Sequence, residues 1–181
     1  MAETTGATTG RSRIMTGLFR DKESAEKAYS SITNRGYKQD DVNVLMSEDT
    51  RNKYYPPGAP VETELGNKSL EGAATGAAIG GTVGATLAAI AAIGTSIVFP
   101  GLGLIVAGPL AAALAGAGAG GATGGLIGAL VGAGIPEERV KHYEEGIKKG
   151  GVVMGVTPRT DEDADYFENE WKSYRGEQIY R

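Results

Sequence analysis

Cysteine is absent from the chain of 181 residues, and histidine occurs once, at His142. The absence of cysteine excludes disulfide bonds, thiol chemistry and cysteine-ligated metal ions. A single histidine leaves little material for a histidine-based metal or acid–base site, and we expect His142 at the surface or the boundary of a helix. The sequence therefore predicts no catalytic residues, no cofactor and no metal site, and it indicates a protein that is not an enzyme.

Charge is absent from the centre of the chain. Positions 72–136, a run of 65 residues, contain no aspartate, glutamate, lysine or arginine. The net charge of −4 is mild, which argues against nucleic acid as a partner. The first residues are polar and have no apolar signal-peptide core, so we expect a disordered tail over residues 1–12.

The segment that precedes this uncharged centre has the pattern of a β-α-β unit over residues 13–50. Residues 13–20 and 41–47 are apolar and partly alternating, which is typical of strands. Between them, Asp21 is placed to cap a helix and Gly36 to end it. The buried stripe expected for this helix consists of Ala25, Ala28, Tyr29 and Ile32.

A similar pattern returns after the centre, over residues 136–181. Pro136 suits the first position of a helix, Gly150 or Gly151 suits its end, and residues 152–157 are typical of a strand. A last helix is expected to start near Asp161. The apolar stripes expected on these two helices are Val140, Tyr143 and Ile147 on the first, and Ala164, Phe167, Trp171 and Tyr174 on the second.

Neither charged segment has enough strands to form a sheet by itself. Together they predict an α+β fold: a ferredoxin-like split β-α-β head interrupted by the uncharged centre. Residues 51–68, which contain three prolines, are expected to be a Pro/Gly linker, and residues 69–135 an apolar helical hairpin.

Glycines recur at every fourth position within this centre. Two helices are expected, at residues 69–98 and 104–134, and residues four apart lie on one face of a helix. Nine glycines in a helix would cost on the order of 9 kcal/mol relative to alanine, so close packing of helix backbones must compensate. The glycine-zipper residues predicted to mediate helix packing and oligomerisation are Gly72, Gly76, Gly80, Gly84, Gly116, Gly120, Gly124, Gly128 and Gly132.

The turn between the two expected helices is the most apolar part of the hairpin. A hairpin that crosses a membrane normally exposes a polar turn on the far side. Here the tip is expected to be buried, either in a lipid bilayer or against the tips of sister chains. The tip residues are Phe99, Pro100, Gly101, Leu102, Leu104 and Ile105.

Three stretches of the chain resemble the bacterial general stress protein family, whose members include heat-induced and low-temperature-induced proteins. They are TGLFRDKESAEKAYSSITNRGYKQDDVNVLMSED (16–49), FPGLGLIVAGPLAAALAG (99–116) and GIPEERVKHYEEGIKKGGVVMGV (134–156). The resemblance implies a bacterial stress-response protein that is cytoplasmic or membrane-associated. It brings no catalytic residues.

Three functions remain open from the sequence. The first is a non-enzymatic, stress-associated protein that forms homo-oligomers through its glycine rows at a membrane. The second is a soluble structural protein that builds shells, tubes or filaments without lipid. The third is a small-ligand sensor on the head, for which the carboxylates Asp40-Asp41, Glu144-Glu145 and the cluster from Asp161 to Asp165 are candidates, although such carboxylates are usually helix caps and solvated surface.

Overall fold

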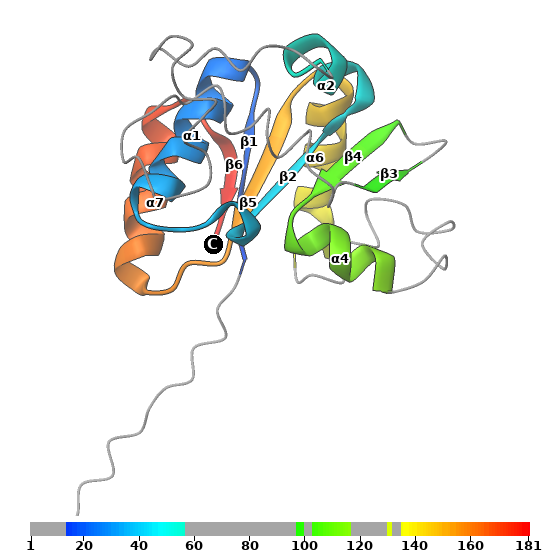
Figure 1. Ribbon diagram of the computed structural model, residues 1–181. Helices are drawn as coiled ribbons and strands as arrows, with labels where there is room; N and C mark the ends of the chain where they lie inside the picture. The colour runs from blue at the N-terminus through cyan, green and yellow to red at the C-terminus, as the bar shows by residue number, and fades with distance from the viewer. Residues whose placement is uncertain (1–13, 57–96, 100–102, 117–129, 132–134) are drawn as a thin grey trace, which may run out of the picture.

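Six antiparallel strands form one sheet in the order β3-β4-β2-β5-β1-β6 (Figure 1). The computed structural model describes residues 14–56, 97–99, 103–116, 130–131 and 135–181. The strands are β1 (Met15–Phe19), β2 (Val42–Ser47), β3 (Ile97–Phe99), β4 (Leu104–Ala107), β5 (Val152–Val156) and β6 (Glu177–Tyr180).

Helices cover both faces of this sheet (Figure 1). Helices α1 and α7 pack side by side on one face, and α6 and α4 lie on the other. The described helices are α1 (Lys22–Asn34), α2 (Glu48–Tyr54), α4 (Pro109–Gly116), α6 (Glu137–Lys148) and α7 (Asp161–Ser173), with a short 3-10 turn, η1, at Gln39–Asp41. The chain is therefore a mixed α+β protein, as the sequence predicted.

The sheet separates two hydrophobic cores. In β1, Phe19 points into the core beneath α1 and α7, while Leu18 points into the core beneath α6 and α4. Successive side chains of a strand point to opposite faces, so a strand that is covered on both faces must be apolar throughout. This explains why every residue of β5 is buried.

The local signals of the two charged segments are confirmed. The side chain of Asp21 accepts a hydrogen bond of 2.9 Å from the backbone N–H of Ser24, and Gly36 and Gly150 follow their helices with φ angles of +81° and +89°. The predicted apolar stripes are buried except at Tyr174, which is only partly buried. Those buried residues are Ala25, Ala28, Tyr29, Ile32, Val140, Tyr143, Ile147, Ala164, Phe167 and Trp171.

Two helix boundaries and one strand differ from the prediction. Helix α6 begins at Glu137, one residue later than expected, with Pro136 as its N-cap. Residues 51–54 were expected in the linker but belong to α2, because the side chain of Ser47 caps this helix by accepting from the N–H of Thr50. The edge strand β6 was not predicted, since its mostly polar sequence lacks the apolar alternation of a strand.

The prediction of helix at both sides of the hairpin turn is wrong. Residues 97–99 form β3 and residues 104–107 form β4, which pairs with β2. The expected tip residues Leu104 and Ile105 are 7% and 3% exposed, and they face the two cores of the head. Without β4, this edge of β2 would leave backbone hydrogen-bonding groups unpaired, and pairing with β2 as a strand overrides the local helical pattern of residues 104–107.

The second expected helix, at residues 104–134, does not form a single straight rod. In a straight helix Leu104 and Leu130 would lie about 39 Å apart at 1.5 Å per residue. Instead both residues belong to the core beneath α6 and α4. This part of the chain therefore returns to the head. The tail at residues 1–12 and most of the first expected helix, at residues 69–98, lie outside the described residues.

Among the described helices, none is both long enough and apolar enough to cross a membrane.

Candidate functional site

Most glycines of the two predicted rows lie outside the described residues. Gly116 is described and is the last residue of α4. Of the predicted tip, Phe99 ends β3, whereas Pro100, Gly101 and Leu102 are outside the described part. The glycines outside it are Gly72, Gly76, Gly80, Gly84, Gly120, Gly124, Gly128 and Gly132.

What the structure does describe is the place where the glycine-rich segments join the head. Strands β3 and β4 and helix α4, at residues 97–99 and 103–116, together form what we call the docked unit. Segment 57–96 precedes it and segment 117–129 follows it. Strand β4 pairs with the outer edge of β2, with Val44 opposite Ala107 and Ser47 opposite Leu104. The docked unit is therefore the anchor of both segments.

Asn43 of β2 holds the docked unit by a buried hydrogen bond. Its Oδ1 atom accepts from the backbone N–H of Leu110 in the first turn of α4 at 2.6 Å, and Asn43 is only 4% exposed. The first N–H groups of a helix have no partner inside the helix, so this side chain acts as a cap from another element. An asparagine in the otherwise apolar stretch VNVLM is the signal that the sequence analysis overlooked.

The turn between β4 and α4 lies directly against the backbone of β2. Gly108 has a φ angle of +94°, and a Cβ atom at this position would lie 2.1 Å from the carbonyl oxygen of Val42. Only glycine adopts this backbone conformation without strain, and only glycine leaves room for the approach. At the other end of β4, the N–H of Glu48 donates to the carbonyl of Gly103 at 2.7 Å. These contacts fix both ends of β4.

The first glycine-rich segment leaves the head at a buried tyrosine. Tyr55, directly after α2, is 4% exposed. Its hydroxyl group and the Oε1 atom of Glu26 in α1 are buried and have no hydrogen-bond partner among the described residues. Burial raises the pKa of Glu26, and burial followed by the nearby charge of Glu26 raises the pKa of Tyr55. The Nζ atom of Lys22 lies 3.6 Å from Oε1 of Glu26 and 5.6 Å from the ring centre of Tyr55.

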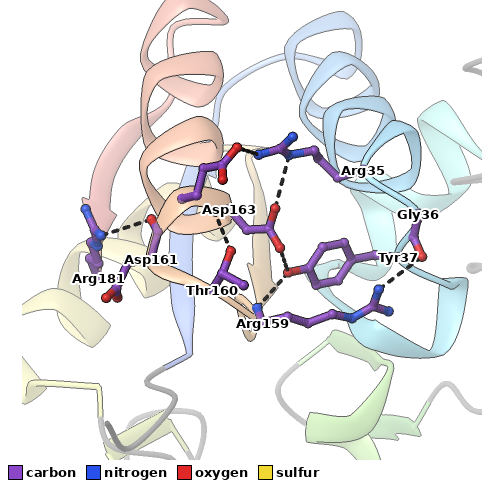
Figure 2. Close-up of polar contacts among 9 residues, drawn as sticks. Arg35, Gly36, Tyr37, Arg159, Thr160, Asp161, Asp163 and Arg181 are labelled. Atoms are coloured by element: carbon purple, nitrogen blue, oxygen red, sulfur yellow. Dashed lines mark hydrogen bonds and ion pairs between the residues drawn. The ribbon is translucent and has the colours of Figure 1, made fainter. Parts of the chain in front are cut away.

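A second polar cluster joins the two halves of the head, between the end of α1 and the start of α7 (Figure 2). The hydroxyl of Tyr37 donates to Oδ2 of Asp163 and accepts from the N–H of Arg159, both at 2.7 Å. The guanidinium of Arg159 lies over the Tyr37 ring, 4.0 Å from its centre, and pairs with Asp41 at 2.9 Å. Burial and the hydrogen bond to Asp163 raise the pKa of Tyr37.

The same cluster uses the other oxygen of Asp163. The Nε atom of Arg35 lies 3.1 Å from Oδ1 of Asp163, and its Nη2 atom lies 3.1 Å from Glu162 (Figure 2). The guanidinium of Arg35 also lies over the ring of Tyr166, 4.7 Å from its centre. Both carboxylate oxygens of Asp163 therefore have a partner, which leaves this side chain poorly placed to bind a ligand.

Several of the other candidate carboxylates form ion pairs on the surface. Glu144 of α6 pairs with Lys148 at 2.6 Å, and Glu145 lies 3.9 Å from Lys149, which directly follows the helix. Asp165 pairs with Arg181. No group of three or more histidine or acidic side chains in the described part of the chain could hold a metal ion. His142 is exposed on α6, as expected.

Comparisons with protein-family models, with curated proteins and with solved structures found no match to this chain. A functional proposal therefore depends on the residues themselves.

Proposed function

We propose that this chain is a non-enzymatic, stress-associated bacterial protein that forms homo-oligomers through glycine rows attached to a folded head. The glycines involved lie at four-residue spacing in the uncharged run at positions 72–136. About 1 kcal/mol of helix propensity is lost at each glycine, so the rows need close backbone packing as compensation.

The way in which the head holds the glycine-rich segments is the observation that carries this proposal. Segment 57–96 runs from the buried Tyr55 to strand β3. Segment 117–129 runs from the end of α4 to Leu130, which is 1% exposed in the core beneath α6 and α4. Each segment is therefore fixed at both ends to the same folded head. A flexible linker between two domains would not be attached in this way.

We further assign the head to the ferredoxin-like class. Without the docked unit, the remaining strands have the order β2-β5-β1-β6. Helix α1 connects β1 to β2, and α7 connects β5 to β6, so both crossovers lie on one face of the sheet. This arrangement supports a split β-α-β repeat that is interrupted after its first half.

The proposal that the protein is not an enzyme is supported by the ion pairs that the candidate carboxylates form. Among the described carboxylates, Asp41, Asp163 and Glu144 are each within 3.1 Å of a basic side chain. Such pairs have a structural explanation and need no substrate.

Contact between chains without lipid is favoured over insertion of the tip into a bilayer. A tip that enters lipid must expose its apolar side chains, but Leu104 and Ile105 are buried within the head. Membrane association is the second candidate, supported by the 65-residue run without charge, which could lie against a bilayer without burying a charged group.

A pair of matched double variants tests the glycine rows. Gly124→Leu with Gly128→Leu places two bulky side chains on the predicted row. Thr123→Leu with Ile127→Leu has the same four-residue spacing on another face and is the control. We expect the first pair to reduce the particle size measured by light scattering and the control pair to leave it unchanged.

The same samples separate the two forms of the proposal. Flotation with lipid vesicles, followed by light scattering with and without detergent, shows whether lipid is involved. Particles that stay large in detergent and do not float indicate assembly without lipid, whereas flotation of the unmodified protein indicates the membrane candidate. Equal particle size and equal flotation for both double variants would show that the glycine rows do not mediate assembly.

A further inference from the structure

The docked unit contacts the head mainly through one side. Its principal contacts are the pairing of β4 with β2, the packing of α4 on β2 and the contact of β4 with α2. Without it, the sheet β2-β5-β1-β6 keeps both of its crossover helices and α6. The outer edge of β2 thus acts as a binding site for a strand, and β4 of the docked unit occupies this site.

Each contact that holds the unit could be made equally well by an identical unit from another copy. The register of β4 against β2, the hydrogen bond from Leu110 to Asn43 and the bond from Glu48 to Gly103 depend only on the two surfaces. Exchange of an identical element between copies, known as domain swapping, preserves every such contact. It therefore joins copies with little loss of free energy.

The chain on either side of the unit is long enough for exchange. Segment 117–129 has 13 residues and segment 57–96 has 40. Fully extended, 13 residues span at most about 45 Å, and as a helix of the proposed glycine row they span about 20 Å, so exchange needs copies in direct contact. Neither connection therefore prevents the unit from reaching the β2 edge of an adjacent copy.

We propose that the docked unit exchanges between copies of this chain, so that β4 of one copy pairs with β2 of another. Docking within one chain benefits from an effective concentration in the millimolar range, so exchange needs copies that are held close together. The inference rests on the proposed function in this one respect, because the glycine rows would supply that proximity.

Disulfide cross-linking between copies tests the exchange directly, since the natural chain contains no cysteine. Ser47→Cys is made in one chain and Leu104→Cys in a second chain that carries a tag to distinguish it by mass. These residues are directly opposite each other across β2 and β4. The two chains are unfolded, mixed in equal amounts, refolded and oxidised, and the products are separated on a non-reducing gel.

We expect a covalent dimer that contains one chain of each kind. The control mixture combines Ser47→Cys with Ala107→Cys, whose residue is three positions out of register and about 10 Å away along the strand. It should give no such dimer above background. The pair Val44→Cys and Ala107→Cys, also in register, repeats the test in case Leu104→Cys weakens the core.

A different outcome would overturn the exchange. If both in-register cysteines in one chain close only an internal disulfide, and both in-register mixtures yield no mixed dimer, the unit docks only on its own head. Large particles without a mixed disulfide would overturn the exchange and leave the proposed function intact. A mixed disulfide in particles whose size Gly124→Leu with Gly128→Leu does not change would support the exchange and contradict the glycine rows.

Discussion

The hydroxyl of Tyr37 donates a hydrogen bond of 2.7 Å to Asp163, a residue 126 positions later in the sequence. Tyr37 follows α1 in the first half of the head, and Asp163 lies in the first turn of α7 in the second half. The bond therefore links the two halves of the head, which the uncharged centre separates in the sequence (Figure 2). A split domain needs such contacts because its two halves are not adjacent in the chain.

Replacement of Tyr37 by phenylalanine should destabilise the head. The substitution removes a hydroxyl that both donates to Asp163 and accepts from the N–H of Arg159. We expect a loss of about 1–2 kcal/mol in the free energy of unfolding, measured by chemical denaturation, because two partially buried groups lose their partner. Tyr166→Phe is the control and should change stability by less than about 0.5 kcal/mol. Equal effects of the two substitutions would contradict a special role for Tyr37.

Glu26→Gln should stabilise the protein at neutral pH. Burial raises the pKa of Glu26 above its ordinary value of 4.5, against the opposing effect of Lys22, whose Nζ atom lies 3.6 Å from Oε1 of Glu26. The folded state therefore binds this proton more tightly than the unfolded state does. The stability gained from protonation is fully present below pH 4.5 and is lost as the pH rises through the folded pKa.

A neutral glutamine avoids this loss, so the variant should exceed the natural protein by about 1 kcal/mol at pH 7 and by almost nothing at pH 4. Thermal unfolding at a series of pH values measures the difference. Glu23→Gln is the control, because Glu23 is exposed and the hydrogen bond from Lys27 lowers its pKa. Its effect should have the opposite sign at pH 7. A Glu26→Gln variant less stable than the natural protein at pH 7 would refute this account.

Asn43→Ala should loosen the docked unit. The substitution leaves the N–H of Leu110 without its buried acceptor, which costs about 1–3 kcal/mol. Relative to the natural protein, we expect the rate of amide hydrogen exchange to increase more in α4 and β4 than in β1 and β5, measured by mass spectrometry. Asn34→Ala, at the exposed end of α1, is the control and should not affect exchange in the docked unit. Uniformly faster exchange over the whole head would mean that Asn43 contributes only to global stability.

Gly146→Ala should destabilise the protein although it lies within helix α6. Alanine gains about 1 kcal/mol over glycine in a helix, but the added Cβ would lie 2.4 Å from Cδ2 of Leu18 in β1. Leu18 is fully buried, and overpacking of a core costs about 1–3 kcal/mol. We therefore expect a net loss of up to about 2 kcal/mol in denaturation experiments. Leu18→Val should cost less in the Gly146→Ala background than alone, and strict additivity would contradict the clash.

The two charged segments were largely predictable because their signals are local. Asp21 and Gly36 bound α1 through contacts within a few residues, and the apolar stripes of α1, α6 and α7 follow from helix periodicity. The candidate site was harder to predict from the sequence. The sequence predicted the glycine rows, but it did not indicate that Asn43 and Gly108 hold the docked unit against β2, since each acts on a residue of a distant element.

The sequence by itself determined the mixed α+β character, the split of the head and the absence of cysteine chemistry. Only the tertiary structure decided that residues 104–107 become a strand, because this depends on the unpaired edge of β2 and not on local propensity. It likewise decided that Leu104 and Ile105 are buried in the head, where the two cores on opposite faces of one sheet take up their alternating side chains.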